Sequence, residues 1–215
     1  LDAERIGWGA SSRNGGMVSG GLKVAGADLD RNHGRERAQS IVEAAAASFP
    51  FIEETIAREG IACDYVRCGR YVGAWSPGHW DAMAARVDFL ARLTGLPAEM
   101  VPKSRQREFL GSDLYCGGMK AAATGSLHPG KYARGLAAAA ERAGALLVDE
   151  VRVQGIAREG SGFRLATTRG ELRADAVLVA TNGYSLDGRG TALPWLARRL
   201  VPLNSYIIAT EELPP

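Results

Sequence analysis

GWGASSRNGG (Gly7–Gly16) decides the fold together with a second stretch, ADAVLVATNGY (Ala174–Tyr184), near the other end of the chain. The first is a glycine-rich loop that follows a short apolar and acidic run, Leu1–Glu4. The second has the pattern of a buried strand that runs into a turn of small residues. Because glycine carries no Cβ, such loops let the backbone approach phosphate and ribose groups closely. The pair is typical of a chain that wraps around a dinucleotide.

The first four residues fit the end of a strand. Dinucleotide folds begin with a strand, a G-x-G-x-x-G loop, a helix and a second strand that ends in an acidic residue. The nearest match to that loop, Gly7–Ser12, has serine in place of the third glycine. Asp2 instead fits the acidic residue that binds a ribose hydroxyl, so we expect the phosphate loop about 20 residues before Leu1. A frayed chain start is the alternative interpretation.

Composition indicates an ordinary globular chain with one large or two small domains. The chain has 215 residues, of which 46% are hydrophobic and 23% are charged. Its net charge of +2 is too small to indicate a nucleic-acid partner. No apolar run approaches the roughly 20 residues that a membrane span needs. We therefore expect neither a nucleic-acid partner nor a membrane span, and the oligomeric state is not predicted.

The cysteines and histidines indicate neither disulfides nor a metal site. Cys63, Cys68 and Cys116 are odd in number and contain no C-x-x-C pair, which argues against a disulfide framework and against zinc. The three histidines are far apart in the sequence, so we expect no bound metal. Unpaired thiols are typical of a reducing compartment, and a cytoplasmic location is the default expectation.

Apolar spacing and helix-ending residues predict three helices, over residues 34–59, 77–94 and 128–143. A glycine follows each of them directly, and glycine closes helices most easily. Pro50 should kink the first helix. That helix also carries a buried stripe of residues spaced three or four apart: Ile41, Ala45, Phe49, Ile52 and Ile56.

Alternating and β-branched runs predict the strands. Three short runs between Val151 and Ala174 predict an antiparallel meander with glycine turns. Ala174–Ala180 is almost continuously apolar, which is typical of a parallel strand covered on both faces. Further strands are predicted at residues 63–67 and 69–75, which would form a tight hairpin, and at 113–122, 145–150 and 199–209.

The pattern changes character twice along the chain, and this predicts an interrupted domain. We expect a mixed α/β (α+β) fold with a partial, Rossmann-like dinucleotide-binding domain and a β-meander. That domain would comprise residues 1–62 and 123–190. A partial, sheet-rich substrate domain, residues 63–122 and 191–215, would interrupt it. A single continuous domain would not switch pattern twice.

Six stretches, in order, resemble the D-amino-acid-oxidase-like family of FAD-dependent oxidoreductases, and within it the gamma-glutamylputrescine oxidoreductase-like group. They are GWGASSRNGG, YVRCGRYVGAWSP, LGSDLYCGGM, SLHPGKYARGL, VLVATNGY and RRLVPLNSYIIATEELP. The resemblance implies that FAD is the cofactor and that the interrupted domain binds it. It also implies that the phosphate-binding glycines and the last FAD-binding segment lie outside these residues, which makes the chain the middle fragment of a longer protein.

The resemblance also implies the cofactor contacts, residue by residue. Asp2 matches the acidic residue that holds the adenosine ribose, where the family more often has Glu, and Val153 matches a position whose backbone meets the adenine edge. The segment that touches the pyrophosphate is matched by Ala10, Ser11 and Ser12. The residues along the ribityl chain and flavin are matched by Arg13, Asn14, Gly15 and Gly16. The strand-end turn against the cofactor is matched by Ala180, Thr181, Asn182 and Gly183.

Each of these residues also has a plainer interpretation. Gly15 and Gly16 could form a simple turn, the turn at Ala180–Gly183 could merely end a strand, and Val153 could be a core valine. His128, which precedes a helix, is interpreted as a cap or a structural residue rather than as a catalytic base. The catalytic residue therefore stays unknown.

The resemblance implies oxidation of the C–N bond of an amine or amino acid, with a hydride passing to flavin N5 and hydrolysis of the imine. The cofactor carries the difficult chemistry, so few catalytic side chains are needed. The alternatives are a flavin-dependent dehydrogenase or hydroxylase of a non-amine substrate, and a non-catalytic scaffold module. The fragment by itself is expected to be inactive.

Overall fold

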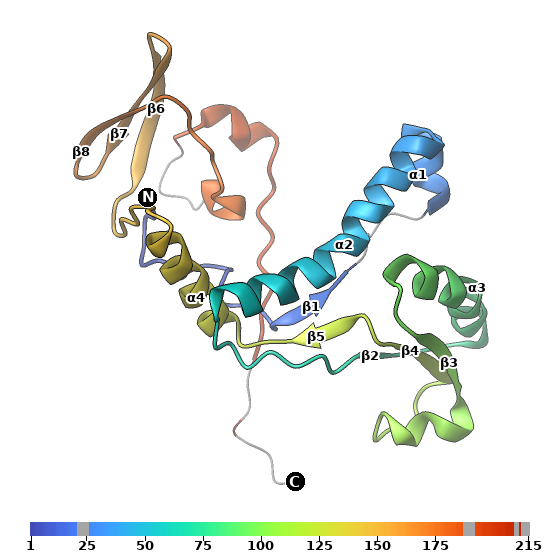
Figure 1. The fold of residues 1–215 in the computed structure, drawn as a ribbon. Helices are drawn as coiled ribbons and strands as arrows, with labels where there is room; N and C mark the ends of the chain where they lie inside the picture. The colour runs from blue at the N-terminus through green and yellow to red at the C-terminus, as the bar shows by residue number, and fades with distance from the viewer. Residues whose placement is uncertain (21–25, 187–191, 209–210, 212–215) are drawn as a thin grey trace. The chain divides into compact units, whose positions relative to one another are not determined.

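The computed structural model describes residues 1–20, 26–186, 192–208 and 211, and the chain divides into two compact units (Figure 1). The first unit comprises Leu1–Asn14 and Ala137–Pro215, and the second comprises Gly15–Leu136. The predicted mixed α/β class is confirmed, since helices and sheets both occur along the chain. The assignment of residues 1–62 and 123–190 to a cofactor domain, and of 63–122 and 191–215 to a substrate domain, stays a prediction.

The second unit contains three complete helices and two antiparallel sheets in its described residues. The helices are α1 (Gly26–His33), α2 (Arg35–Glu59) and α3 (Pro77–Thr94). β1 (Met17–Ser19) pairs with β5 (Thr124–Ser126). The other sheet has the order β2-β4-β3 and is formed by β2 (Arg70–Gly73), β4 (Gly117–Ala121) and β3 (Ala98–Pro102), and the 3-10 helix η1 (Lys103–Glu108) follows β3.

The three predicted helices are confirmed, and their ends follow from local chemistry. Gly60 closes α2 in the left-handed conformation with φ 64°, and the N–H of Ile61 donates to the carbonyl of Ile56 at 3.0 Å. Ser76 caps α3 by accepting the N–H of His79 at 3.2 Å. The third predicted helix is α4 (Pro129–Arg142). The kink expected at Pro50 stays a prediction.

The predicted hairpin of residues 63–67 and 69–75 is wrong. β2 pairs with β4, in the register Tyr71 opposite Lys120, while Val66 forms an isolated bridge with Ser126. The two segments therefore have different partners, both of them far away in the sequence. β-branched and aromatic residues favour a strand, but they do not identify its neighbour.

In the first unit, the predicted meander is confirmed. β6 (Val153–Glu159), β7 (Gly162–Thr167) and β8 (Gly170–Ala174) form an antiparallel sheet in that order. Gly160 and Gly170 have positive φ at the two turns, where a residue with a side chain would be strained. Leu165 is buried and lies opposite Leu172, which is 45% exposed. Two short 3-10 helices, η2 (Asn182–Leu186) and η3 (Pro194–Arg198), follow.

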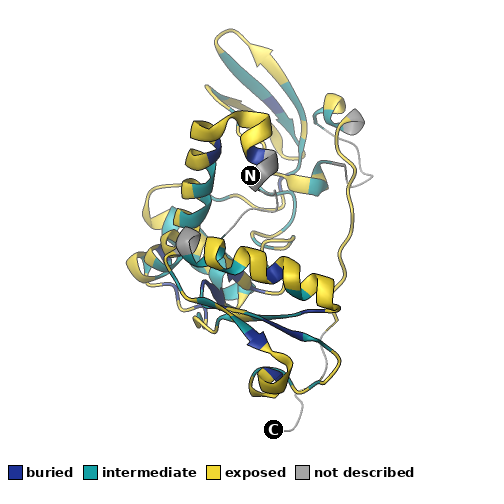
Figure 2. Cartoon of the chain, turned by 90° about the vertical axis from the view of Figure 1, so that its right-hand side faces the viewer, coloured by how far each residue is buried: buried dark blue, intermediate teal, exposed yellow. Residues whose placement is uncertain are grey.

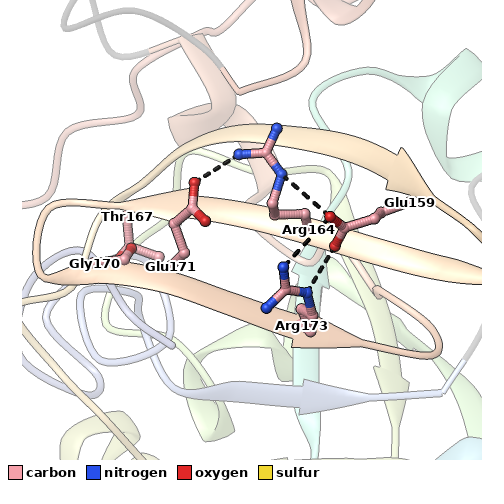
Figure 3. Close-up of polar contacts among 6 residues, drawn as sticks. All are labelled: Glu159, Arg164, Thr167, Gly170, Glu171 and Arg173. Atoms are coloured by element: carbon pink, nitrogen blue, oxygen red, sulfur yellow. Dashed lines mark hydrogen bonds and ion pairs between the residues drawn. The ribbon is translucent and has the colours of Figure 1, made fainter.

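Figure 3 shows the charged face of this meander. Arg164 and Arg173 lie directly opposite each other on β7 and β8. Each arginine forms an ion pair with a glutamate. Arg164 Nη1 is 2.6 Å from Glu171 Oε1, and Arg173 Nε is 2.8 Å from Glu159 Oε2. Because these pairs are exposed, they offset the like-charge repulsion but add little further stability.

Three other predicted strands are wrong. Residues 145–150, 175–180 and 199–208 form no strand, and residue 209 lies outside the described residues. Figure 2 colours much of the chain as exposed. In these segments Leu178 is 92% exposed and Leu203 is 88% exposed. A strand needs a hydrogen-bonded neighbour along its length. Residues 145–150 make only a few backbone bonds to residues 2–4, and within the described residues none of the three segments joins a sheet. None of the helices in the described part of the chain combines the length and the apolar character of a membrane span.

Candidate cofactor site

Asp2 is held by the segment that leads into the meander. Its N–H donates to the carbonyl of Val148, and its own carbonyl accepts the N–H of Val151, both at 2.9 Å. Its carboxylate oxygen Oδ1 accepts the N–H of Glu4 at 3.0 Å. Val153 starts β6 two residues after Val151. The structure thus brings together the two positions predicted to meet the adenosine end of a dinucleotide.

The glycine loop of the first unit, residues 7–14, is closed by its own polar side chains. The hydroxyl of Ser12 donates to the carbonyl of Gly7, and Asn14 Nδ2 donates to the carbonyls of Ala10 at 2.9 Å and Ser11 at 3.3 Å. These hydrogen bonds shape the loop. The contacts of Ser12 and Asn14 with a cofactor stay a prediction.

Ser11, Arg13 and Asn14 are the exposed polar residues of this loop. The guanidinium carbon of Arg13 lies 4.3 Å from the ring centroid of Trp8, which is a cation–π contact. A guanidinium matches the geometry of phosphate oxygens, so this loop offers one positive charge beside its main chain.

The turn at residues 180–185 is equally well fixed by its own hydrogen bonds. The N–H of Tyr184 donates to the carbonyl of Thr181 at 3.0 Å, and the hydroxyls of Thr181 and Ser185 are 2.6 Å apart. The Ser185 hydroxyl also donates to the carbonyl of Asn182 at 2.9 Å, while Asn182 has φ 47°. Ala180 is exposed and Gly183 is half-buried. A turn bonded in this way presents a defined surface.

Sequence reasoning missed Trp8 and Tyr184, which join the loop to the turn. Their ring centroids lie 6.0 Å apart at an interplanar angle of 61°. A Cβ on Gly9 would lie 2.9 Å from Cε2 of Tyr184, so the tyrosine ring covers this glycine. The available signal was position: Trp8 lies between two glycines of the loop, and Tyr184 follows the turn directly. Candidate residues from the two ends of the chain thus meet within one unit.

Gly15 and Gly16 belong to the second unit and differ from each other. Gly16 has φ 66°, and a Cβ there would overlap the carbonyl oxygen of Leu127. Gly15 is exposed, with no atom within 4 Å of its Cβ position. The chain's own packing therefore requires glycine at position 16, whereas position 15 leaves space for a ligand.

His128 caps a helix, as its position predicts. Its Nδ1 accepts the N–H of Lys131 at 3.3 Å at the start of α4, and its own N–H donates to the carbonyl of Cys63 at 2.8 Å. Cys63 is buried, and burial raises the pKa of its thiol. These contacts support the interpretation of His128 as a cap.

A charged cluster in the second unit joins α2 to residues 65–67. Glu53 accepts hydrogen bonds from the hydroxyl of Tyr65 and from Nε of Arg67, the latter at 2.9 Å. The bond to Arg67 is the main cause that lowers the pKa of Glu53. Burial, and then the hydrogen bond to Glu53, raises the pKa of Tyr65 to about 12. In the described residues, no group of three His, Cys, Asp or Glu side chains is placed to hold a metal ion.

Comparison with known proteins adds a family to this geometry. The family described as "FAD dependent oxidoreductase" (DAO) matches residues 1–215. The probable oxidoreductase OrdL of Rhizobium meliloti (strain 1021) is 30% identical over 218 residues, which cover 99% of this chain and 49% of that protein. Gamma-glutamylputrescine oxidoreductase of Escherichia coli (strain K12) is 28% identical over 213 residues, with the same coverage. The chain spans about half the length of the curated relatives it matches.

Solved structures agree with the fold. Glycine oxidase from Geobacillus kaustophilus aligns with a TM-score of 0.65 at 26% identity, over 92% of this chain and 50% of that chain. Glycine oxidase from Bacillus cereus aligns with a TM-score of 0.66 at 18% identity, again over 92% of this chain. The second likeness is one of fold alone, and it supports the Rossmann-like class predicted from the sequence.

Proposed function

We propose, from the premise that this chain belongs to the DAO family of FAD-dependent oxidoreductases, that the intact protein containing it oxidises the C–N bond of an amine or amino acid. The observation that carries this proposal is the similarity along 99% of the chain to a relative named for gamma-glutamylputrescine. A structure named for glycine oxidase, similar over 92% of the chain, supports it. Both names contain a compound with a C–N bond, and the carbon of that bond carries a hydrogen that can leave as a hydride.

The residues of the first unit fit the groups of FAD. A carboxylate suits ribose hydroxyls, and Asp2 has one that is anchored through its Oδ1 and half-buried. A guanidinium and glycine main chain suit phosphates, and the loop offers Arg13 and Gly9. These residues therefore offer an acceptor that suits ribose hydroxyls and donors that suit phosphate oxygens.

We assign the holding roles accordingly. Asp2 and the backbone of Val153 would hold the adenosine, and Ala10, Ser11 and Ser12 would line the pyrophosphate. The ribityl chain and flavin would lie along a segment formed by Arg13, Asn14, Gly15 and Gly16. The surface against the cofactor would be completed by Ala180, Thr181, Asn182 and Gly183.

When bound, FAD would supply the acceptor for the hydride that leaves the carbon next to the substrate nitrogen. The chain's own residues bind and orient: Ser12 and Asn14 keep the loop in shape through bonds to its carbonyls. The substrate-binding side chains would come from the β2-β4-β3 sheet and from residues beyond this chain. The cytoplasmic location predicted from the cysteines stays part of this proposal.

The experiment that tests this function measures turnover by the intact protein. Purified protein supplied with FAD is given a panel of primary amines, amino acids and N-substituted glycines, with hydroxy acids as the matched non-amine set. We expect oxygen to be consumed and a carbonyl product to form with at least one amine and with no hydroxy acid. Turnover of hydroxy acids alone would favour the dehydrogenase alternative. FAD binding with no turnover of any compound would contradict the proposed reaction.

A further inference from the structure

We infer that Tyr184 is a positioning residue, whose ring holds the loop of residues 7–14 in the shape that binds the cofactor. The inference rests on the proposed function, because it assigns that loop to FAD. Tyr184 ends a stretch that carries the family resemblance, but the resemblance assigned this residue no contact with the cofactor.

The first support is the contact with Gly9. A Cβ at this position would lie 2.9 Å from Cε2 and 3.4 Å from Cζ of Tyr184. Gly9 does not have a positive φ, so its backbone alone does not require glycine. The ring of Tyr184 is therefore the group that a side chain at this position would have to displace.

The second support is a chain of contacts that runs from the ring to Arg13. Tyr184 meets Trp8 edge-on at 6.0 Å, and the guanidinium of Arg13 lies over Trp8 at 4.3 Å. Edge-to-face pairs and cation–π contacts both depend on orientation. A shift of the tyrosine ring would therefore change where Trp8 and Arg13 lie, and Arg13 is a residue we place at the cofactor.

The third support is the fixed base of the tyrosine. Its N–H is bonded to the carbonyl of Thr181, and the Ser185 hydroxyl bonds the carbonyl of Asn182 within the same turn. The loop opposite is closed by its own bonds from Ser12 and Asn14. Two locally ordered segments thus meet through one ring. A loop that is already ordered loses less entropy when a ligand binds, which strengthens binding.

The test is a set of variants of the intact protein, freed of FAD and titrated with FAD while flavin fluorescence reports binding. Tyr184→Ala should weaken FAD binding about tenfold, the scale of an oriented aromatic contact. Tyr184→Phe should bind as the wild type does, because the contacts described involve the ring and not the hydroxyl. Gly9→Ala should also weaken binding. In the Tyr184→Ala background, Gly9→Ala should add little, because the ring it would displace is gone.

The second unit offers a matched control. Tyr115 meets Trp75 at 4.8 Å and 62°, and a Cβ on Gly73 would overlap the ring of Tyr115. Tyr115→Ala therefore removes the same kind of contact from residues that we do not assign to the cofactor. We expect it to leave FAD affinity unchanged. An equal loss of affinity in both variants would overturn the inference, since any lost aromatic pair would then have the same effect.

Amide hydrogen exchange of the FAD-free protein tests the contact without the ligand. Residues 8–14 should exchange faster in Tyr184→Ala than in the wild type and in Tyr184→Phe, and unchanged exchange would overturn the inference. If the wild type and Tyr184→Ala bind FAD equally well, the inference is overturned and the proposed function stands. A wild type that binds no FAD overturns both. If Tyr184→Ala does not fold, the comparison of Gly9→Ala with Tyr184→Phe decides.

Discussion

Leu127 donates its N–H to the carbonyl oxygen of Gly16 at 2.9 Å, and its own carbonyl oxygen occupies the space that a Cβ on Gly16 would need. Gly16 has φ 66° and immediately precedes β1, where β1 begins to pair with β5. Gly15, its neighbour, has neither constraint. Of two adjacent glycines with the same predicted role, the fold itself requires one.

Gly16→Ala should therefore destabilise the protein strongly, by about 3 kcal/mol, because alanine would be strained at this φ and would collide with backbone. Gly15→Ala is the matched control and should change the free energy of unfolding by less than about 0.5 kcal/mol. Urea unfolding of the intact protein measures both. Equal midpoints for the two variants would contradict the geometry at Gly16.

Gln106 is fully buried and bonds two backbone groups of the second unit. Its Nε2 donates to the carbonyl of Ser112 at 2.7 Å, and its Oε1 accepts the N–H of Gly117 at 3.2 Å. Gln106→Leu should cost about 2–4 kcal/mol, because both backbone groups would lose a buried partner. Gln154→Leu, at an exposed glutamine, is the control for the change in composition. A thermal melt in which the two variants coincide would rule out this role for Gln106.

Two leucines on the same face of the meander give a third comparison. Leu165 is 6% exposed and the directly opposite Leu172 is 45% exposed. Leu165→Ala should cost about 2–4 kcal/mol, because a buried leucine leaves a cavity when it is truncated. Leu172→Ala should cost less than about 1 kcal/mol. Denaturant unfolding checks the difference, and a larger loss at Leu172 would show that the burial is assigned to the wrong residue.

Tyr65 makes stability depend on pH in the alkaline range. Its pKa is raised from 10.0 to about 12, first by burial and then by Glu53, so between these values the unfolded chain loses a proton that the folded chain keeps. Stability contributed by this group is present below pH 10 and is lost as the pH rises toward 12. Tyr65→Phe should reduce the loss of unfolding free energy over this range. Tyr206→Phe, at an 85% exposed tyrosine, should retain it. The same alkaline loss in both variants would remove Tyr65 from this account.

The sequence predicted what local chemistry determines. The helices followed from spacing and from Gly60, Gly95 and Gly144 as stops, and the meander followed from glycine turns at Gly160 and Gly170. The strands at 175–180 and 199–208 were wrong, because an apolar run does not specify whether a neighbouring strand lies beside it. The hairpin at 63–75 was wrong for a related reason, since β2 pairs with the distant β4.

The candidate site was predicted in part. Resemblance indicated the glycine loop and the strand-end turn, but the contact of Tyr184 with Gly9 joins residues that are far apart in the sequence. An aromatic residue after a turn reads in the same way whether it fills a core or positions a loop. The sequence alone likewise does not distinguish Gly15 from Gly16. Their structural roles differ only through the backbone φ and the position of Leu127.

The central claim is that the intact protein uses FAD to oxidise a C–N bond, and anaerobic titration of its visible flavin absorption tests this most directly. The account predicts that the flavin absorption bleaches when one of the amines or amino acids is added, and that hydroxy acids leave it unchanged. A protein that retains no flavin absorption once FAD has been supplied and the unbound FAD removed would contradict it. A protein whose flavin is bleached by hydroxy acids and by no amine would contradict it as well.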